Sequence, residues 1–597
     1  MNLLLPLLLA CTGKFTPLDT DSGATDTADP GPPPTDDDGD GWFTPEDCDD
    51  GDPLVNPDAV EVCDGADNNC DGNIDVNEAV DATPWYKDGD GDGYGDPAGG
   101  IATCSQPPGF VPDGTDCDDA NPATNPGAPE VCNDGSDNNC NGDALECAIS
   151  GELLLADAPA IVWGEAGGDQ AGSAIAGVGD VDGDGFDDLM VGAPYRDAGG
   201  NSDAGAAYLL SGPLSGSSSL SAATAILTGT SRSDKAGIAV AGAGDVDGDG
   251  YADLLVSAWH SDLGGADSGA VYLLRGPVSG TRALSSAEAI LVGEVSYDYA
   301  GVGLSGGVDL TGDGRPDIVL GAYGQGESSD QNRGRAYVVS GEVSGTLDLA
   351  KATAWIDGSE SYDRVSQVVA LGDVDGDGSA DLAVGAWSWP DNDNQGAAFV
   401  FSGPLAGALT LDDAAARLEG EEGEGQAGTS LAGAGDVNGD GYEDLLVGAP
   451  LLDTDASEAG VAWLVFGPME TGSLAGADLR FVGTEARADF GYSVAGGGDF
   501  DGDGRPDVLI GAPSADGNGT DSGGAWLYYT PAAGTLGPAD ADLVFVPELA
   551  RDLAGGAVSF VGNVNGDCCD DVGIGATASS RGGAGSGAAW FFMGQGI

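Results

Sequence analysis

The 597-residue sequence predicts an all-β fold built from repeated small sheets, and two observations support this prediction. The first is an acidic nine-residue segment, Asp180 to Asp188, whose further copies begin at Asp245, Asp309, Asp373, Asp436, Asp499 and Asn563. Neighbouring copies start 65, 64, 64, 63, 63 and 64 residues apart, which marks a repeat architecture. The second is that each period holds four short apolar runs joined by Gly-rich turns. Four strands per period are typical of a propeller blade, so we expect a seven-bladed β-propeller.

The order of the strands predicts how the ring closes. In the first repeat, apolar runs at 173–179, 188–194, 205–210 and 224–228 surround the acidic segment. Runs of the fourth type occur at 161–163, 225–227, 289–292, 354–356, 416–418, 479–482 and 543–546. The first of these precedes the first acidic segment, and none follows the last apolar run at 588–592. We therefore expect 161–163 to complete the last blade and to remove an exposed sheet edge.

The acidic segment, called the aspartate loop below, has the chemistry of a calcium site. Carboxylates at positions 1, 3, 5 and 9 can converge, position 7 can offer a carbonyl, and glycine at position 6 permits a sharp turn. Hard oxygen ligands on a flexible loop suit Ca2+ better than Mg2+. Four unneutralised carboxylates would repel one another, so we expect metal binding to be coupled to folding. The alternative is an acidic surface turn without metal.

The candidate ligands in the seven loops follow from these positions. They are Asp180, Asp182, Asp184, Phe186, Asp188, Asp245, Asp247, Asp249, Tyr251, Asp253, Asp309, Thr311, Asp313, Arg315, Asp317, Asp373, Asp375, Asp377, Ser379, Asp381, Asp436, Asn438, Asp440, Tyr442, Asp444, Asp499, Asp501, Asp503, Arg505, Asp507, Asn563, Asn565, Asp567 and Asp571. The third loop has a hydroxyl at position 3, and the seventh has lost charge and its position-6 glycine, so occupancy of these two loops stays open. Cys568 and Cys569 in the seventh loop are either free thiols or a vicinal disulfide, with a redox role as the rival interpretation.

Residues 36–80 and 81–150 form two related modules, rich in cysteine and aspartate, that precede the propeller at 151–597. Each contains an Asp-Cys-Asp-Asp motif, at 47–50 and 116–119, and an Asp-Asn-Asn-Cys motif. Further candidate Ca2+ ligands are Asp36, Asp38, Asp40, Asp67, Asn69, Asp71, Asp75, Asp88, Asp90, Asp92 and Asp96. Eight of the 11 cysteines lie between 48 and 147, so disulfides and metal are expected to replace a large core here, as a small irregular region. A transition-metal site made by these cysteines is the alternative.

The N-terminus indicates export. Residues 1–10 form an apolar run that is too short to span a bilayer and that ends in Leu8-Leu9-Ala10-Cys11. This tetrad resembles the lipobox of bacterial lipoproteins, which implies lipidation of Cys11, followed by a disordered tether over 11–35. Because a basic segment is absent before the apolar run, an upstream start, an ordinary signal peptide or a chance apolar end remain alternatives. We expect a bacterial outer-membrane or cell-surface lipoprotein that touches the membrane through its anchor only, or else a secreted protein.

The net charge of −83, with 101 acidic and 18 basic side chains, argues against nucleic-acid binding and favours divalent cations. A hydrophobic content of 41% excludes a wholly disordered chain.

Two resemblances extend this interpretation. Phe490-Gly491, the loop from Asp499 to Asp507, and Gly511-Ala512-Pro513 resemble the Phe-Gly…Gly-Ala-Pro (FG-GAP) repeats of the integrin alpha-subunit propeller, and the likeness covers 151–597. It implies structural Ca2+ in the loops, on the face opposite the ligand. The two N-terminal modules resemble the Cys-rich metal-binding motif of secreted myxobacterial proteins and, more loosely, thrombospondin type 3 repeats.

On a propeller, the loops that join strands 2 and 3, and those that join strand 4 to the next strand 1, share the face opposite the aspartate loops. Candidate ligand-binding side chains in these loops are Trp259, His260, Tyr297, Tyr299, Tyr323, Tyr362, Trp387 and Trp389, accompanied by Arg333 and Arg364. Aromatic rings and arginines on one rim suit recognition of a glycan or a protein. The alternative is that several of these rings pack between blades.

Catalysis has little support in the sequence. The chain has one histidine, His260, and no Gly-x-Ser-x-Gly or His-Glu-x-x-His motif, so we do not expect an enzyme. The sequence predicts an exported, lipid-anchored, calcium-binding surface protein whose propeller serves as an adhesion or recognition module for an extracellular glycan or protein. Two alternatives remain: a propeller-based extracellular hydrolase of polysaccharide or phosphodiester, and a purely structural surface protein.

Overall fold

The computed structural model describes residues 35–74, 79–128, 137–140, 149–325, 332–390, 394–421, 423–531, 534–567 and 569–594. The predicted leader at 1–10, Cys11 with its lipid, the tether up to residue 34, Asp75 and Cys568 lie outside these ranges. The chain divides into two compact units, Met1–Ala128 and Pro129–Ile597. Over the described ranges the secondary structure consists of β-strands and single 3-10 turns, so the all-β class is confirmed. A search of the same residues found no helix of the length and apolarity needed to cross a membrane.

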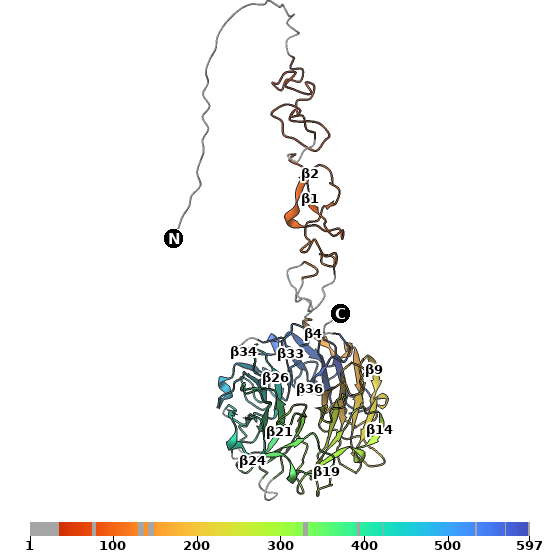
Figure 1. The fold of residues 1–597 in the computed structure, drawn as a ribbon, viewed down its shortest axis with the longest axis vertical. Helices are drawn as coiled ribbons and strands as arrows, with labels where there is room; N and C mark the ends of the chain where they lie inside the picture. The colour runs from red at the N-terminus through yellow and green to blue at the C-terminus, as the bar shows by residue number, and fades with distance from the viewer. Residues whose placement is uncertain are drawn as a thin grey trace, which may run out of the picture. The chain divides into compact units, whose positions relative to one another are not determined.

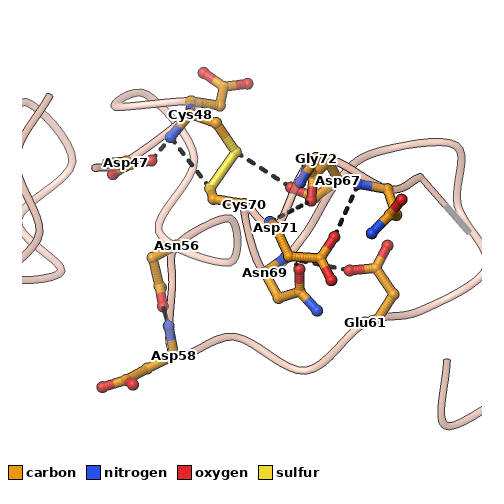
Figure 2. The surroundings of a disulfide bond; sticks show 12 residues. Asp47, Cys48, Asn56, Asp58, Glu61, Asp67, Asn69, Cys70, Asp71 and Gly72 are labelled. Carbon is orange, nitrogen blue, oxygen red and sulfur yellow. Dashed lines mark hydrogen bonds between the residues drawn. A yellow bond between two sulfur atoms is a disulfide. The ribbon is translucent and has the colours of Figure 1, made fainter. Parts of the chain in front are cut away.

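The N-terminal unit has little regular structure. One antiparallel sheet of order β2-β1-β3 is formed by β1 (Thr83–Lys87), β2 (Ile101–Thr103) and β3 (Phe110–Val111), with the 3-10 turn η1 (Pro97–Gly99) between β1 and β2. Disulfides join Cys48 to Cys70 (Figure 2) and Cys63 to Cys104, the second one linking the two modules. These four sulfur atoms are therefore not thiolate ligands, which argues against the transition-metal alternative at these cysteines.

The C-terminal unit is a β-propeller, and its described residues form seven five-stranded sheets, called blades below. The first blade runs from the centre outwards as β6 (Ile175–Gly179), β7 (Asp188–Ala193), β8 (Ala206–Leu210), β10 (Ala225–Thr228) and β14 (Gly280–Ala283). Its first four strands are antiparallel and coincide with the predicted apolar runs. The fifth strand, β14, is parallel to β10 and comes from the next repeat, where it precedes that repeat's own fourth strand.

The remaining blades repeat this order. The second consists of β11 (Val240–Gly244), β12 (Asp253–Ala258), β13 (Ala270–Leu274), β15 (Ala289–Val292) and β19 (Gly345–Asp348). The third consists of β16 (Leu304–Gly306), β17 (Asp317–Ala322), β18 (Arg335–Ser340), β20 (Ala354–Asp357) and β24 (Gly407–Thr410). The fourth consists of β21 (Val365–Leu371), β22 (Asp381–Ala386), β23 (Ala397–Phe401), β25 (Ala416–Glu419) and β29 (Gly472–Ser473).

The last three blades complete the ring. The fifth consists of β26 (Ser430–Gly435), β27 (Asp444–Ala449), β28 (Val461–Val465), β30 (Leu479–Val482) and β34 (Gly534–Leu536). The sixth consists of β31 (Ser493–Gly496), β32 (Val508–Gly511), β33 (Ala525–Tyr528), β35 (Leu543–Val546) and β4 (Gly151–Leu154). The seventh consists of β36 (Ala554–Gly562), β37 (Asp571–Ala576), β38 (Ala588–Phe592), β5 (Ala160–Trp163) and β9 (Gly216–Ser219). One 3-10 turn precedes each fourth strand: η2 (Leu155–Asp157), η3 (Leu220–Ala222), η4 (Leu284–Ser286), η5 (Leu349–Lys351), η6 (Leu411–Asp413), η7 (Leu474–Gly476) and η8 (Pro538–Asp540).

The N-terminal strands of this unit close the ring, as predicted. β5 pairs antiparallel with β38, with Ile161 opposite Trp590, and β4 pairs parallel with β35. Figure 1 shows the blades following one another around the ring in chain order, with β4 beside the blue C-terminal strands. Because two blades share strands from both ends of the unit, opening the ring breaks two sheets.

The core lies between neighbouring blades. The second strands, such as β7, are buried along their whole length, and each hydrophobic cluster joins side chains from adjacent blades. The first strands of all seven blades line one central channel. They are rich in glycine and alanine because neighbours are close there: a Cβ on Gly177 would lie 2.7 Å from the carbonyl carbon of Val561.

Candidate metal loops and ligand face

Each aspartate loop connects the first and second strands of a blade and is wound by hydrogen bonds to its own carboxylates. In the first loop, Asp180 accepts N–H groups of Gly183 at 2.6 Å and Gly185 at 3.0 Å, and Asp184 accepts the N–H of Phe186 at 3.0 Å. The loop that starts at Asp245 repeats these contacts. This winding brings the acidic side chains to one side of the loop.

The predicted carboxylates converge. Oxygen atoms within 4.8 Å of one another are contributed in three of the loops by Asp180, Asp182 and Asp188, by Asp245, Asp247 and Asp249, and by Asp373, Asp375 and Asp381. In the sixth loop, Oδ1 of Asp499 is buried and has no hydrogen-bond partner. Clustered hard oxygen atoms, some of them unpartnered, fit a divalent cation.

The aspartate at position 9 has a second role that the sequence did not reveal. Asp188 is buried; its Oδ2 accepts the N–H of Val181 within the loop, and its Oδ1 accepts the N–H of Gly212 beyond the third strand, both at 3.0 Å. Burial raises the pKa of this carboxyl to about 6. Burial likewise raises the pKa of its equivalents, to about 6 for Asp253, Asp317 and Asp444, about 7 for Asp571 and about 8 for Asp507. Position 9 therefore fastens the loop to the blade as well as facing the other carboxylates.

Position 8, which the sequence did not single out, connects neighbouring loops. The N–H of Asp187 donates to the carbonyl of Asn563 at 3.2 Å, and its carboxylate accepts the N–H of Asn563 at 2.9 Å. Glu443 and Asp570 accept the N–H groups of Gly372 and Asp499 in the same way. Position 8 thus couples the first loop to the seventh, the fifth to the fourth and the seventh to the sixth.

The two atypical loops satisfy part of their polar groups internally. In the third loop, Thr311 donates its N–H to Asp317 at 2.7 Å, and Ser340 donates its hydroxyl to Asp313 at 2.6 Å. In the seventh loop, the Asn565 side chain donates to the Asp567 carboxylate at 2.6 Å. Cys569 of this loop is buried.

The N-terminal candidate loops show the same winding. Asp36, Asp38 and Asp40 form one converging group, and Asp88, Asp90 and Asp92 form another. Figure 2 shows the N-terminal candidate loop that begins at Asp67, beside the Cys48–Cys70 disulfide. Its Asp67 carboxylate accepts the N–H groups of Asp71 and Gly72. There, Asn69 Oδ1 also accepts the N–H of Asp71 at 3.0 Å. Asp96, predicted at position 9 of the loop at 88, instead caps η1, with Oδ1 accepting the N–H of Ala98 at 2.7 Å.

Five of the eight aromatic or histidine candidates on the opposite face gather in one cluster. Tyr299 and Tyr323 are stacked, with ring centroids 4.9 Å apart and an interplanar angle of 3°. Trp259 lies 6.0 Å from Tyr299 and meets His260 edge-on at 4.9 Å. Tyr297, 49% exposed, lies 6.4 Å from Tyr299.

Cations extend this cluster in both directions. The Lys235 ammonium lies 4.9 Å from the Tyr195 ring and 5.9 Å from the Trp259 ring, and neither Lys235 nor Tyr195 was predicted from the sequence. The Arg364 guanidinium lies 4.4 Å from the Trp387 ring. Burial raises the pKa of the Tyr323 hydroxyl, and the nearby positive charge of Arg364 opposes this rise. We call the following set the aromatic arc: Tyr195, Lys235, Trp259, His260, Tyr297, Tyr299, Tyr323, Arg364 and Trp387.

Two of the eight aromatic or histidine candidates, and also Arg333, lie outside the arc. Trp389 meets Phe399 edge-on at 5.9 Å, packs against the core of blades three and four, and has the Arg417 guanidinium 5.3 Å from its ring. It therefore follows the alternative of packing between blades. Tyr362 is partly exposed on the loop after β20.

His260 has one charged partner. Its Nδ1 lies 2.7 Å from Oδ1 of Asp267. Over the described residues, no hydrogen bond connects His260 to a serine, threonine or cysteine.

Comparisons with known proteins agree with this architecture. The FG-GAP repeat family matches residues 171–210, 236–274, 427–465 and 490–528, and the FG-GAP-like repeat family matches residues 309–384. A metal-binding motif family, Cu-binding_MopE, matches residues 47–75 and 116–146.

Curated relatives match parts of the chain. Integrin alpha-PS2 of Drosophila melanogaster is 38% identical over 162 residues, which is 26% of this chain and 11% of that protein. Phosphatidylinositol-glycan-specific phospholipase D of Homo sapiens is 31% identical over 177 residues, which is 28% of this chain and 21% of that protein. Human integrin alpha-IIb is 37% identical over 150 residues, or 24% of this chain and 14% of that protein. The chain thus spans about a fifth or less of the length of these relatives.

Two solved structures are weakly similar. BBS1N in complex with ARL6DN has a TM-score of 0.35 at 12% identity, covering 73% of this chain and 98% of that one. The Dos1 propeller has a TM-score of 0.34 at 11% identity, covering 63% and 74%.

The repeats and the blades together define the class of this molecule: an FG-GAP β-propeller. More particularly, the chain is an FG-GAP repeat protein with metal-binding motifs in a disulfide-bonded N-terminal region, and part of it is similar to integrin alpha subunits.

Proposed function

We propose that this chain is an exported surface protein whose propeller binds an extracellular glycan or protein through the aromatic arc, while Ca2+ in the aspartate loops stabilises the ring. The observation that carries the proposal is the gathering of rings and cations from four consecutive blades at the end of the strands opposite the aspartate loops. Aromatic side chains supply large contact area at a low entropic cost, and cations beside them add directional polar contacts.

The residues of the arc differ from the residues at the equivalent positions of the other blades. This difference distinguishes the arc from packing that is common to all blades. The residue that follows the Gly-Ala or Ser-Ala pair at the end of the second strand is Pro194, Trp259, Tyr323, Trp387, Pro450, Pro513 and Thr577 in the seven blades. A large aromatic ring thus replaces proline or threonine in blades two, three and four alone. A scaffold role shared by all blades would not need this difference.

A second repeated position supports the same conclusion. Every blade places one residue at a backbone φ between 53° and 58° just before its first strand: Gln170, Lys235, Tyr299, Arg364, Gln426, Asp489 and Leu553. The left-handed conformation disfavours bulky side chains. Lys, Tyr and Arg nonetheless occupy it in blades two, three and four, the same blades that carry the rings.

A glycan and protein ligand array tests the proposal. Trp259→Ala and Trp387→Ala in the full chain are each expected to weaken binding on the order of 10-fold or more. The matched control is Tyr492→Ala, because Tyr492 is 48% exposed just before β31 at the same end of the strands but outside the arc. Equal binding by wild type and both tryptophan variants would contradict the proposal.

Export and anchoring rest on the N-terminal sequence and on the kind of families that match. The disulfides are stable in an oxidising compartment, and the Leu8 to Cys11 tetrad supplies the acylation motif. Expression in a bacterial host with labelled palmitate should label the wild type but not Cys11→Ser. Secretion without label would support the soluble secreted alternative.

The propeller is proposed to be a binding module and not a hydrolase. The phospholipase D relative and the His260–Asp267 pair are the observations on the side of an enzyme. No nucleophile is hydrogen-bonded to His260 over the described residues, and each repeated aspartate has a role in a loop. We expect no hydrolysis of model phosphodiesters or polysaccharides, and activity lost in His260→Ala would overturn this.

A further inference from the structure

The second N-terminal loop meets carboxylates from a motif far along the chain. Asp88, Asp90 and Asp92 hold carboxylate oxygens within 4.8 Å of one another. Asp119, from the Asp-Cys-Asp-Asp motif, accepts the N–H of Gly89 through Oδ1 at 2.6 Å. A Cβ on Gly89 would lie 2.6 Å from Oδ2 of Asp119, so the loop and the motif are in close contact.

Asp116, the first residue of this motif, is buried without a full set of partners. It is 2% exposed, its Oδ1 accepts the N–H of Asp118 at 2.8 Å, and its buried Oδ2 has no hydrogen-bond partner. Oδ2 of Asp90 and Oδ2 of Asp92 are likewise buried and have no hydrogen-bond partner. The N–H of Asp116 donates to the carbonyl of Gly95 at 3.3 Å, which places this residue directly beside the loop that carries Asp90 and Asp92.

The first module repeats the arrangement. Asp50 accepts the N–H of Asp37 at 3.2 Å. Asp47 is 2% exposed, its Oδ1 accepts the N–H of Asp49 at 2.9 Å, and its Oδ2 has no hydrogen-bond partner. Oδ2 of Asp38 is also buried and unpartnered.

The two copies share their geometry but not their spacing. Asp47 follows Asp40 by 7 positions, whereas Asp116 follows Asp92 by 24. The longer stretch contains η1, β2 and β3. Local turn preferences cannot produce the same arrangement across such different connections. The shared feature is a set of carboxylates that needs a common positive partner, because unpaired buried charge is costly.

We propose that each N-terminal module holds one Ca2+ in a composite site, formed by its acidic loop and closed by its Asp-Cys-Asp-Asp motif. The ligands are Asp36, Asp38, Asp40, Asp47 and Asp50 in the first module and Asp88, Asp90, Asp92, Asp116 and Asp119 in the second. Carboxylates alone suit a hard cation with many oxygen ligands. No described lysine or arginine forms an ion pair with these groups. The inference rests on the same class of ion as the proposed function, but on separate residues.

The composite site explains why the motif joins aspartate to cysteine. Cys48 follows Asp47 directly, and its disulfide to Cys70 holds the motif in place. In the second module, a cation between the loop and Asp116 closes the segment that carries β2 and β3. Metal and disulfide therefore cross-link a region that has few buried apolar side chains.

Native mass spectrometry of the full chain in Ca2+ tests the inference by counting bound ions. Asp116→Asn with Asp119→Asn should lower the count by one, Asp47→Asn with Asp50→Asn should lower it by one, and all four together by two. Asp96→Asn is the matched control and should leave the count unchanged, because Asp96 caps η1. The intact mass also reports whether the disulfides of each variant have formed.

Gly89→Ala provides a second variant that removes no charge. Its methyl group displaces the Asp119 carboxylate and should also lower the count by one. An unchanged count in the Asp116/Asp119 variant with its disulfides formed, or a loss in Asp96→Asn, would overturn the inference. If the propeller bound no Ca2+, the wild-type chain would bind fewer ions, but each variant would still differ from it by the same number. The two proposals can therefore fail separately.

Discussion

Asp188 and its equivalents at position 9 of the aspartate loops connect metal chemistry to blade stability. Each is buried, and in the first loop one oxygen atom holds the loop while the other holds the segment after the third strand. A carboxylate that accepts two backbone N–H groups cannot be replaced by an amide without placing a donor against a donor. Replacing any one of these residues should therefore lower the free energy of unfolding even without metal.

Asp188→Asn is predicted to destabilise the metal-free protein by about 1–3 kcal/mol. Urea unfolding in EGTA measures this contribution. The control is Asp184→Asn, because Asp184 lies exposed at position 5 and accepts one N–H, from Phe186. We expect that variant to matter in Ca2+ but little in EGTA. Equal effects of the two variants in EGTA would contradict the dual role of position 9.

The raised pKa values predict opposite pH dependence with and without metal. Burial places the pKa at about 6 for Asp188 and about 8 for Asp507, above the unfolded value of about 4. Between these values the folded state binds more protons than the unfolded state, so in EGTA stability should fall as pH rises from about 4 to about 8. In Ca2+, which binds the ionised form, stability should rise with pH.

Thermal melts at pH 5.5 and pH 8 check this prediction. Asp507→Asn cannot titrate at this position, so its melting temperature in EGTA should depend less on pH than that of the wild type. The same direction of change in EGTA and in Ca2+ would show that these carboxyls do not face a metal.

At the scale of elements, the sequence predicts those strands whose own residues form an apolar pattern. The four inner strands of every blade are apolar and were predicted from the sequence. The strand that closes the ring, β5, was predicted as well. The fifth strand was not found, because β14 and its equivalents are short and largely exposed, and carry no alternation of apolar residues. They are held by pairing with a neighbouring blade, which is a non-local property.

The candidate sites show the same limit. The spacing of acidic residues identified the loops, but Asp116 joins its loop from 24 positions beyond Asp92 and has no local signal. Lys235 and Tyr195 were missed because their contact with each other and with Trp259 depends on blade packing. An alignment of the seven repeats on their second strands could have identified Lys235 and Tyr195 from the sequence.

The closing strand gives a prediction at this scale. Ile161 is buried opposite Trp590, and proline there removes a backbone donor in the strand between β38 and β9. Ile161→Pro should cost about 3 kcal/mol or more and promote self-association through the exposed edge of β38. The control is Glu152→Ala in the exposed strand β4. Light scattering together with urea unfolding measures both effects, and a monomer of unchanged stability would contradict the closure.

At the scale of the whole molecule, the blades form a ring to whose two faces we assign separate tasks. Hydrogen bonds from position 8 couple neighbouring aspartate loops on one face. The opposite face is free to vary, and there blades two to four depart from the repeat to form most of the aromatic arc. In the proposed function, metal bound on one face would stabilise the scaffold that positions ligand contacts on the other.

The thermal melt of the full chain in Ca2+ and in EGTA tests this account most directly. We predict that chelation lowers the melting temperature of the propeller on the order of 10 °C or more, because several ions bind the folded state alone. Restoring Ca2+ should restore the melting temperature, and Mg2+ should do so less well. A melt that is identical in Ca2+ and EGTA would contradict the claim that calcium in the aspartate loops holds the ring together.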